Sequence, residues 1–156
     1  MSKIIKFGFN NKELHKIAME IRVKVFVDEQ KVPIEIEEEY EEESTHFLIY
    51  HRRKVVGTAR YRRTDDGIKF ERFAFLKEYR GKGFGNDILR YMLTDVQPFA
   101  QRIYLNAQIT AIDFYKKKGF IISGNKFDEG GIIHYPMTYE APDILSKALE
   151  KAICRR

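Results

Sequence analysis

The sequence is poor in several features, and each shortage excludes a class of protein. Its only cysteine, Cys154, cannot form a disulfide within the chain, so a reducing cytoplasm is the expected location. No apolar run approaches the roughly 18 residues that a membrane helix needs. The stretch 1–9 also lacks the long apolar core of a signal peptide. We therefore expect a cytoplasmic protein with no membrane partner.

What is present resembles an ordinary globular domain. The chain has 156 residues, of which 44% are hydrophobic and 33% are charged, a balance typical of soluble domains with one core. Because there is no internal repeat and no long linker rich in Pro or Ser, we expect a single domain over residues 1–156. The net charge of +5 favours anionic partners such as nucleic acid or a small polyphosphate.

The charges are distributed unevenly. Residues 34–44 hold seven glutamates and no base, which predicts a solvated loop; attraction of a polyamine or a lysine-rich peptide is the alternative. Residues 51–63 hold six Lys or Arg and no acid. Strand alternation would divide these bases between two faces, and no aromatic platform accompanies them, so no nucleic-acid partner is predicted.

Hydrophobic periodicity predicts the element order β α β β β α β α β β α. The strands are expected over 3–9, 45–53, 54–63, 68–76, 102–107, 120–124 and 131–139, and the helices over 12–26, 86–96, 110–120 and 142–153. The central strand, helix and strand form a crossover unit, which predicts that strands 68–76 and 102–107 are parallel. The apolar stripe of the last helix predicts that it covers the sheet or forms a homodimer contact.

A glycine-rich stretch, "EYRGKGFGN" over residues 78–86, is typical of a phosphate-binding loop. A Walker A loop would need Ser or Thr after the lysine, and none follows Lys82. A dinucleotide fingerprint would need a third glycine where Asn86 stands. What remains is Arg-x-x-Gly-x-Gly at the start of a helix, either an anion site or a turn that merely begins the helix.

These residues, with the strand before them, resemble motif A of the GNAT superfamily of N-acetyltransferases, whose Arg/Gln-x-x-Gly-x-Gly/Ala pattern falls on Arg80, Gly83 and Gly85. "AIDFYKKKGF", residues 111–120, is similar to motif B of the same superfamily. "IRVKVFVDEQKVP", "THFLIY" and "VGTARYRR" resemble its ElaA-like branch.

The resemblance implies an α/β fold of the α+β type. It implies a mixed, mostly antiparallel twisted sheet of about seven strands, with helices on both faces and a splayed parallel strand pair that holds CoA. The implied activity moves an acetyl group from acetyl-CoA to a primary amine of a small molecule or peptide, by direct attack in a ternary complex. No metal is implied. The alternative is a non-catalytic acyl-CoA-binding sensor with the same fold.

The resemblance also implies which residues bind acetyl-CoA. The pantetheine arm pairs with the backbone of the strand before the loop, at Phe73, Ala74 and Phe75. Asn106 lies near the pantetheine at the end of the second parallel strand. The pyrophosphate is bound by backbone N–H groups of the loop, which are those of Arg80, Gly81, Lys82, Gly83, Phe84 and Gly85.

Three residues are candidates for proton transfer. Tyr115 matches the motif B tyrosine that acts as general acid toward the leaving sulfur; the alternative is a tyrosine packed on the sheet. Glu71 is a candidate base, expected on the same strand face as Phe73 and Phe75; the alternative is a cross-strand ion pair with Arg60 or Arg62.

His134 is the second candidate base, because imidazole titrates near neutral pH. The branch pattern around it resembles Gly-Ile-Pro-His, but Ile133 stands where proline is expected and Pro136 is additional. His46, at the start of a strand, is predicted to be structural.

The acceptor side is predicted from the branch pattern alone. Arg22, Glu29 and Gln30 match that pattern and are expected to shape the acceptor pocket. Direct attack needs no covalent enzyme intermediate, so no nucleophilic role is expected for Cys154.

Overall fold

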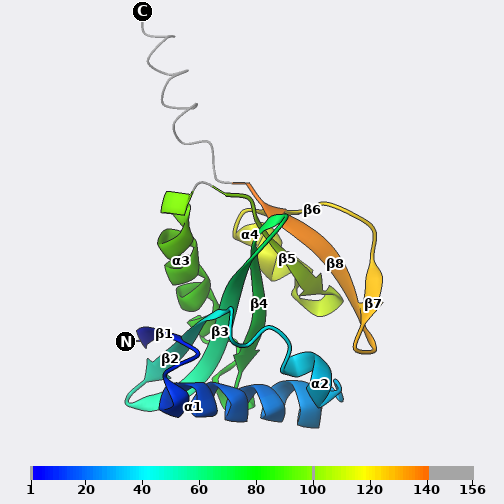
Figure 1. Ribbon diagram of the computed structural model, residues 1–156. Coiled ribbons are helices and arrows are strands. Elements are labelled where there is room, and N and C mark those ends of the chain that lie inside the picture. Colours follow the sequence, from blue (N-terminus) through cyan, green and yellow to red (C-terminus); the bar gives the residue numbers. More distant parts are fainter. Residues whose placement is uncertain (1, 100, 141–156) are drawn as a thin grey trace, which may run out of the picture.

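The computed structural model describes residues 2–99 and 101–140 (Figure 1). The strands are β1 (Ser2–Gly8), β2 (Thr45–His51), β3 (Lys54–Thr64), β4 (Gly67–Phe75), β5 (Ile103–Gln108), β6 (Phe120–Ile122), β7 (Phe127–Glu129) and β8 (Ile132–Tyr139). The α-helices are α1 (Lys12–Arg22), α2 (Ile34–Glu37), α3 (Phe84–Val96) and α4 (Ile112–Lys117). The helix predicted over 142–153, its dimer contact and Cys154 lie outside the described residues.

The strands form one sheet in the order β1-β2-β3-β4-β5-β8-β6, and β7 pairs with β8. Within the described ranges β4 and β5 are parallel and every other pairing is antiparallel, which confirms the predicted mixed sheet and its parallel pair. The strand that sequence reasoning missed is β7, whose three residues form a hairpin with β8. Gly130 and Gly131, both with positive φ, make its turn.

The core has a part on each face of the sheet, as predicted. Residues of β2 alternate between the faces: Phe47 and Ile49 pack with α3, whereas Leu48 packs with α1. The apolar stripe of α3 is buried there, with Ile88 and Met92 fully inaccessible to solvent.

The first helix changes its geometry as it approaches the site. Asn11 caps α1, because its side-chain oxygen accepts a hydrogen bond from the Leu14 N–H at 3.2 Å. After Arg22 the chain continues as a π-helical segment, Val23–Glu29, in place of the predicted regular helix over 12–26. π-Helical turns are rare and frequently lie at functional sites. Here the segment delivers Gln30 to the cavity described below.

Strands β4 and β5 separate along their length. Their pairing covers three positions, from Ile68 opposite Ile103 to Phe70 opposite Leu105, and beyond that point the two strands no longer pair with each other. This divergence confirms the predicted splayed pair. Side chains of the unpaired ends line a cavity.

A β-bulge in β4 corrects one detail of the prediction. Glu71 is paired with Arg60 and Ala74 with Thr58, so β4 has one more residue than β3 between these pairs. Arg72, with φ of 61°, lies in the bulge. The bulge breaks the expected alternation. Glu71 therefore lies on the α1 side with its partner Arg60, whereas the side chains of Phe73 and Phe75 pack with the α3 side of the core.

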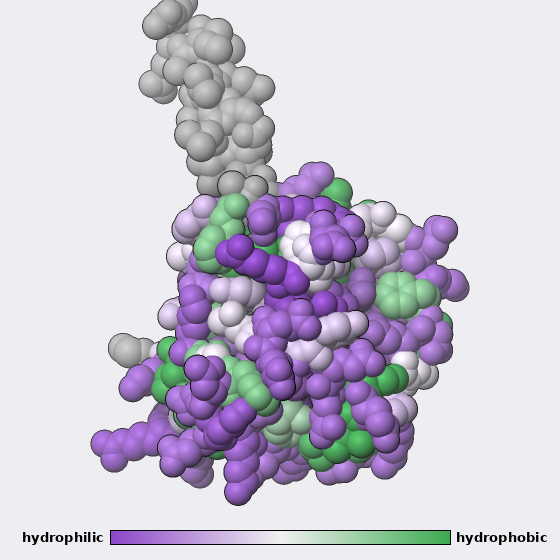
Figure 2. Space-filling view, in the orientation of Figure 1, coloured by the Kyte–Doolittle hydropathy of each residue, from purple (hydrophilic) through white to green (hydrophobic). Residues whose placement is uncertain are grey.

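The surface is mostly hydrophilic in the view of Figure 2, and its apolar residues gather in small patches between polar ones. No helix within the described residues has both the length and the apolar character that a membrane crossing requires.

Candidate active site

A cavity of about 160 Å³ lies where β4 and β5 separate, far more than the roughly 10–15 Å³ that one water molecule requires. Its walls come from the π-helical segment, β4, β5, α4 and the β7–β8 hairpin. Of the predicted site residues, it brings together Gln30, Glu71, Phe73, Asn106, Tyr115 and His134. Arg22, Glu29 and the glycine loop do not line it.

The glycine loop leads directly into α3 and adopts conformations that favour glycine. Gly81 has φ of 75°, and Gly83, with φ of 91°, is the left-handed N-cap of α3. The first helical hydrogen bond runs from the Asp87 N–H to the Gly83 carbonyl at 3.1 Å. The backbone N–H groups of residues 84–86 therefore have no partner within the helix, and they favour an anion. This geometry fits a pyrophosphate.

We expect Gly83→Ala to weaken CoA binding about tenfold. A side chain in the left-handed conformation costs roughly 1–2 kcal/mol, and 1.4 kcal/mol corresponds to a tenfold change in affinity. A Cβ at Gly83 would meet no atom within 4 Å, so the effect comes from backbone strain. Alanine favours other conformations of the free loop, and CoA binding must restore the left-handed one. Calorimetric titration with CoA measures it. Gly8→Ala, on β1, is the matched control, and equal affinity of all three proteins would remove the loop from CoA binding.

Arg80 ties the loop to its surroundings. Its Nε donates to the Phe75 carbonyl at 2.9 Å, and its Nη2 donates to Glu29 Oε2, also at 2.9 Å. The carboxylate of Glu29 is thus held beside the loop by Arg80, and its expected role in the acceptor pocket stays a prediction. The Phe75 carbonyl, proposed from the sequence to pair with pantetheine, is also occupied by Arg80.

Tyr115 extends from α4 into the cavity wall. Its ring packs edge-on against Phe73 and Phe120, at centroid distances of 5.9 and 5.8 Å. Burial raises the pKa of Tyr115, so the phenol keeps its proton at neutral pH. The side chain is packed on the sheet, and it also lines the cavity. Its role as a general acid stays a prediction.

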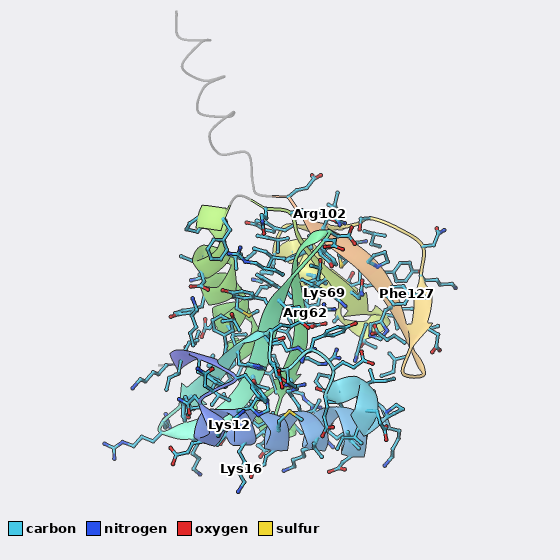
Figure 3. All side chains as sticks on the ribbon, viewed as in Figure 1. Lys12, Lys16, Arg62, Lys69, Arg102 and Phe127 are labelled. Carbon is cyan, nitrogen blue, oxygen red and sulfur yellow. The ribbon has the colours of Figure 1, made fainter. Side chains whose placement is uncertain are left out.

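Glu71 is held by cations from two strands. Its Oε1 accepts from Arg60 Nη2 at 2.9 Å and from Arg62 Nε at 2.8 Å, and Lys69 Nζ lies 3.3 Å from Oε2. Arg62 and Lys69 are labelled in Figure 3. Burial raises the pKa of Glu71, but the neighbouring cations, Arg60 first, outweigh it and lower that pKa to about 2. The cross-strand ion pair is therefore present, and the carboxylate is too weak a base to take a proton from an ammonium ion.

We expect the Glu71 carboxylate to contribute about 3 kcal/mol to stability at pH 7, from a folded-state pKa of about 2 against an ordinary 4.5. Because the folded-state pKa is depressed, the contribution is complete above pH 4.5 and is lost as pH falls toward 2. Glu71→Gln should lower the free energy of unfolding at pH 7 and make it less dependent on pH between 5 and 2. Urea unfolding at several pH values measures both. Glu42→Gln, at an exposed position, is the control; if Glu71→Gln and wild type lose stability in parallel, the assignment is wrong.

His134, on β8, offers a nitrogen that can accept a proton. Its Nδ1 lies 2.7 Å from the Ile132 carbonyl, which can only accept a hydrogen bond. Nδ1 is therefore the donor, and Nε2 carries the lone pair of the neutral imidazole. The ring stacks on Phe127 of β7, labelled in Figure 3, at a centroid distance of 5.7 Å. Two residues further along β8, Pro136 pairs with Asn106.

Arg22, which is expected from the sequence to shape the acceptor pocket, does not line the cavity and is only 1% exposed, but it contacts Glu37, which does line it. Arg22 Nε donates to Glu37 Oε1 at 2.6 Å, and its Nη2 contacts Glu41 Oε1. Arg60 Nη1 lies 3.2 Å from the same Glu41 oxygen. The glutamate run is thus only partly a solvated loop, because Glu37 and Glu41 are buried counter-ions. Their spacing of four residues does not distinguish them, since Glu35 and Glu39, Glu38 and Glu42, and Glu39 and Glu43 have the same spacing.

Sequence reasoning also missed several residues of the cavity. Gln108 exchanges two amide hydrogen bonds with Gln30, at 2.9 and 3.4 Å, and so joins the end of β5 to the π-helical segment. Arg72 donates to the Ile36 carbonyl at 2.8 Å. Glu129 lines the cavity from β7 and, within the described ranges, has no cationic side chain within 4.0 Å.

Comparisons with known proteins agree with this geometry. A family model described as "Acetyltransferase (GNAT) domain" matches residues 10–141. The uncharacterized N-acetyltransferase YjcF of Bacillus subtilis is 40% identical over 130 residues, which cover 81% of this chain and 93% of YjcF.

Two solved structures show the same fold. The crystal structure of Escherichia coli ElaA superposes with a TM-score of 0.79 at 23% identity, covering 90% of this chain and 100% of ElaA. A GNAT family acetyltransferase from Elizabethkingia anophelis, solved with acetyl-CoA bound, has a TM-score of 0.67 at 14% identity, covering 88% of this chain and 94% of its own.

Proposed function

The chain belongs to the GNAT acetyltransferase family and is an acyltransferase, and we propose that it transfers an acetyl group from acetyl-CoA to a primary amine of a small molecule or peptide. The observation that carries the proposal is the cavity between the separated ends of β4 and β5, where a protonated phenol and an imidazole with a free nitrogen line the same space. A proton donor and a proton acceptor are what amine acylation requires.

The donor site combines the glycine loop and the unpaired end of β4. The pyrophosphate would be bound by backbone N–H groups between Gly81 and Asn86, several of which have no helical partner. The backbone of Phe73 and Ala74 lies beyond the last β4–β5 pair, so β4 can accept a pantetheine arm along that edge. Bound there, acetyl-CoA supplies a thioester carbonyl as the electrophile.

The proton transfers are assigned to His134 and Tyr115. An alkylammonium ion has a pKa of about 10.4 and must lose a proton before the amine can attack. We assign that proton to His134 Nε2. The cations around Glu71 lower its pKa to about 2, which makes its carboxylate too weak a base. The protonated Tyr115 phenol would donate to the departing thiolate. Attack is direct, in a ternary complex, and uses no covalent intermediate on the enzyme.

Glu129 supports an amine acceptor. The other two glutamates of the cavity, Glu37 and Glu71, are each bound by arginines, which neutralise their charge. Among the described residues Glu129 has no cationic partner, and a carboxylate without a counter-ion in a cleft attracts the ammonium form of an amine. We propose that Glu129 helps to bind the acceptor before the ammonium proton is lost.

A panel of amines tests the function. Purified protein is incubated with acetyl-CoA and polyamines, amino acids, amino sugars or lysine peptides, and release of free CoA thiol is followed. Amine-dependent thiol release, with acetylated product found by mass spectrometry, is the expected result. Tight CoA binding by calorimetry without turnover on any amine would contradict the proposal and favour the non-catalytic acyl-CoA sensor.

A further inference from the structure

A second cluster of polar side chains lies on the α1 side of the sheet, outside the acetyl-transfer cavity. It consists of His15 of α1, Glu41 of the loop that follows α2, and His46 of β2. In the part of the chain that the structure describes, these are the three side chains whose ligand atoms converge as those of a metal site do, all within 4.8 Å of one another. We propose that this cluster binds a divalent transition-metal ion of the zinc type.

The distances within the cluster suit such an ion. Glu41 Oε2 lies 3.2 Å from His15 Nε2 and 3.3 Å from His46 Nε2. Zinc binds His nitrogen and carboxylate oxygen at about 2.0–2.2 Å with tetrahedral geometry, which places neighbouring ligand atoms roughly 3.3–3.5 Å apart. The two imidazole–carboxylate separations therefore match a tetrahedral centre, and the ligand nitrogens of the two histidines lie within 4.8 Å of each other. Two histidines and one carboxylate are a common zinc ligand set, with a water in the fourth position.

The ligands are held in place by neighbours. The ring of Phe9 packs edge-on against His15 at 5.0 Å, and the ring of Phe7 stacks on His46 at 5.5 Å. Arg22 and Arg60 both contact Oε1 of Glu41, which leaves Oε2 facing the histidines. Partners that orient a ligating carboxylate from behind are a regular feature of metal sites.

The cluster is also accessible from solvent. His15 and Glu41 line a surface hollow together with Met19 and Tyr40, and the exposed glutamates Glu38, Glu42 and Glu43 complete its lining. The hollow provides an entry path and room for a water ligand. The exposed carboxylates favour a cation and offset the positive charges of Arg22 and Arg60 behind the site. This assignment gives the exposed part of the glutamate run a role.

The sequence predicted no metal, because the three ligands come from separate elements and form no spaced His or Cys motif. Without metal, His15 Nε2 would donate a hydrogen bond to Glu41 Oε2 at 3.2 Å, and His46 Nε2 would donate one to the backbone carbonyl of Glu41 at 3.1 Å. In a zinc site, added zinc displaces those protons, whereas a purely hydrogen-bonded cluster keeps them. A measurement of zinc binding therefore distinguishes the two.

The experiment is a calorimetric titration of the untagged full chain with zinc chloride in a buffer without chelators. We expect one ion per chain. Glutamine can still donate a hydrogen bond to Glu41 but is a poor zinc ligand, so His15→Gln and His46→Gln should each lower the affinity at least about tenfold. His51→Gln replaces a histidine outside the cluster, and Cys154→Ser removes the thiol; both should bind zinc as wild type does.

Two results would overturn the proposal. One is the absence of stoichiometric zinc binding to wild type, and the other is binding that His15→Gln leaves unchanged. Each variant is first checked for folding by circular dichroism. If the variant of the buried His46 does not fold, zinc binding by the His15→Gln variant, at a half-buried position, decides the test. Because the readout is metal binding, failure here leaves the acetyltransferase proposal untouched, and failure of the amine panel leaves this one untouched.

Discussion

Tyr115→Phe is expected to lower kcat by roughly ten- to a thousandfold, the usual loss when a general acid is removed. The substitution deletes the hydroxyl and keeps the ring that packs against Phe73 and Phe120, so the fold and the KM for acetyl-CoA should change little. Because burial raises the pKa of Tyr115, the wild-type phenol stays protonated through neutral and mildly alkaline pH, and the deficit should persist across that range. Thiol release with a saturating amine measures it.

Tyr104→Phe is the matched control. Tyr104 lies on β5, and its hydroxyl shares a hydrogen bond of 2.6 Å with Thr64 instead of lining the cavity. Its variant should retain wild-type kcat. A Tyr115→Phe enzyme as fast as wild type would remove Tyr115 from the mechanism and leave protonation of the thiolate to solvent.

Arg22→Met should destabilise the protein by about 3–5 kcal/mol, the cost of removing one partner from a buried ion pair. The change leaves the buried carboxylates of Glu37 and Glu41 without the guanidinium that contacts both. Burial already raises the pKa of Glu37 despite the opposing effects of Arg22 and Arg72, so little compensation remains once Arg22 is gone. Urea unfolding followed by circular dichroism at pH 7 measures the loss.

Arg63→Met provides the comparison for this variant. Arg63 is exposed on β3 and lies over the ring of Phe99, so its replacement should change stability by only about 0.5 kcal/mol. If Arg22→Met lost no more than Arg63→Met, the ionic network would be structurally unimportant and Glu37 would be stable in its buried position without a counter-ion.

Most of the fold was predictable because its signals are local. Alternation over β2 and β3 and the apolar stripe of α3 each reflect one face of one element against the core. The parallel β4–β5 pair followed from the strand–helix–strand crossover that connects the two strands. The missed strand, β7, has three residues, too few to show a periodic pattern, and it is defined only by its pairing with β8.

The candidate site was predictable to a similar depth. Tyr115, His134 and Asn106 were selected from a family resemblance, and all three line one cavity. Arg22 and Glu29 do not line that cavity: Arg22 is bound to Glu37 of the cavity wall, and Glu29 is bound to Arg80 of the glycine loop. Nothing near either residue in the sequence identifies its partner, which lies 15 or 51 positions away.

The sequence by itself determined the order of the elements and the conformation of the glycine loop, since both depend on interactions among residues a few positions apart. Only the tertiary structure decided how the charges pair. Residues 34–44 contain seven glutamates, residues 51–63 contain six bases, and Arg22 and Lys69 lie outside both segments. The composition alone allows many different ion pairs among them. Coulomb energy depends on distance and on burial. Folding selected Glu37 and Glu41 as buried partners of Arg22 and surrounded Glu71 with cations that make it a poor base.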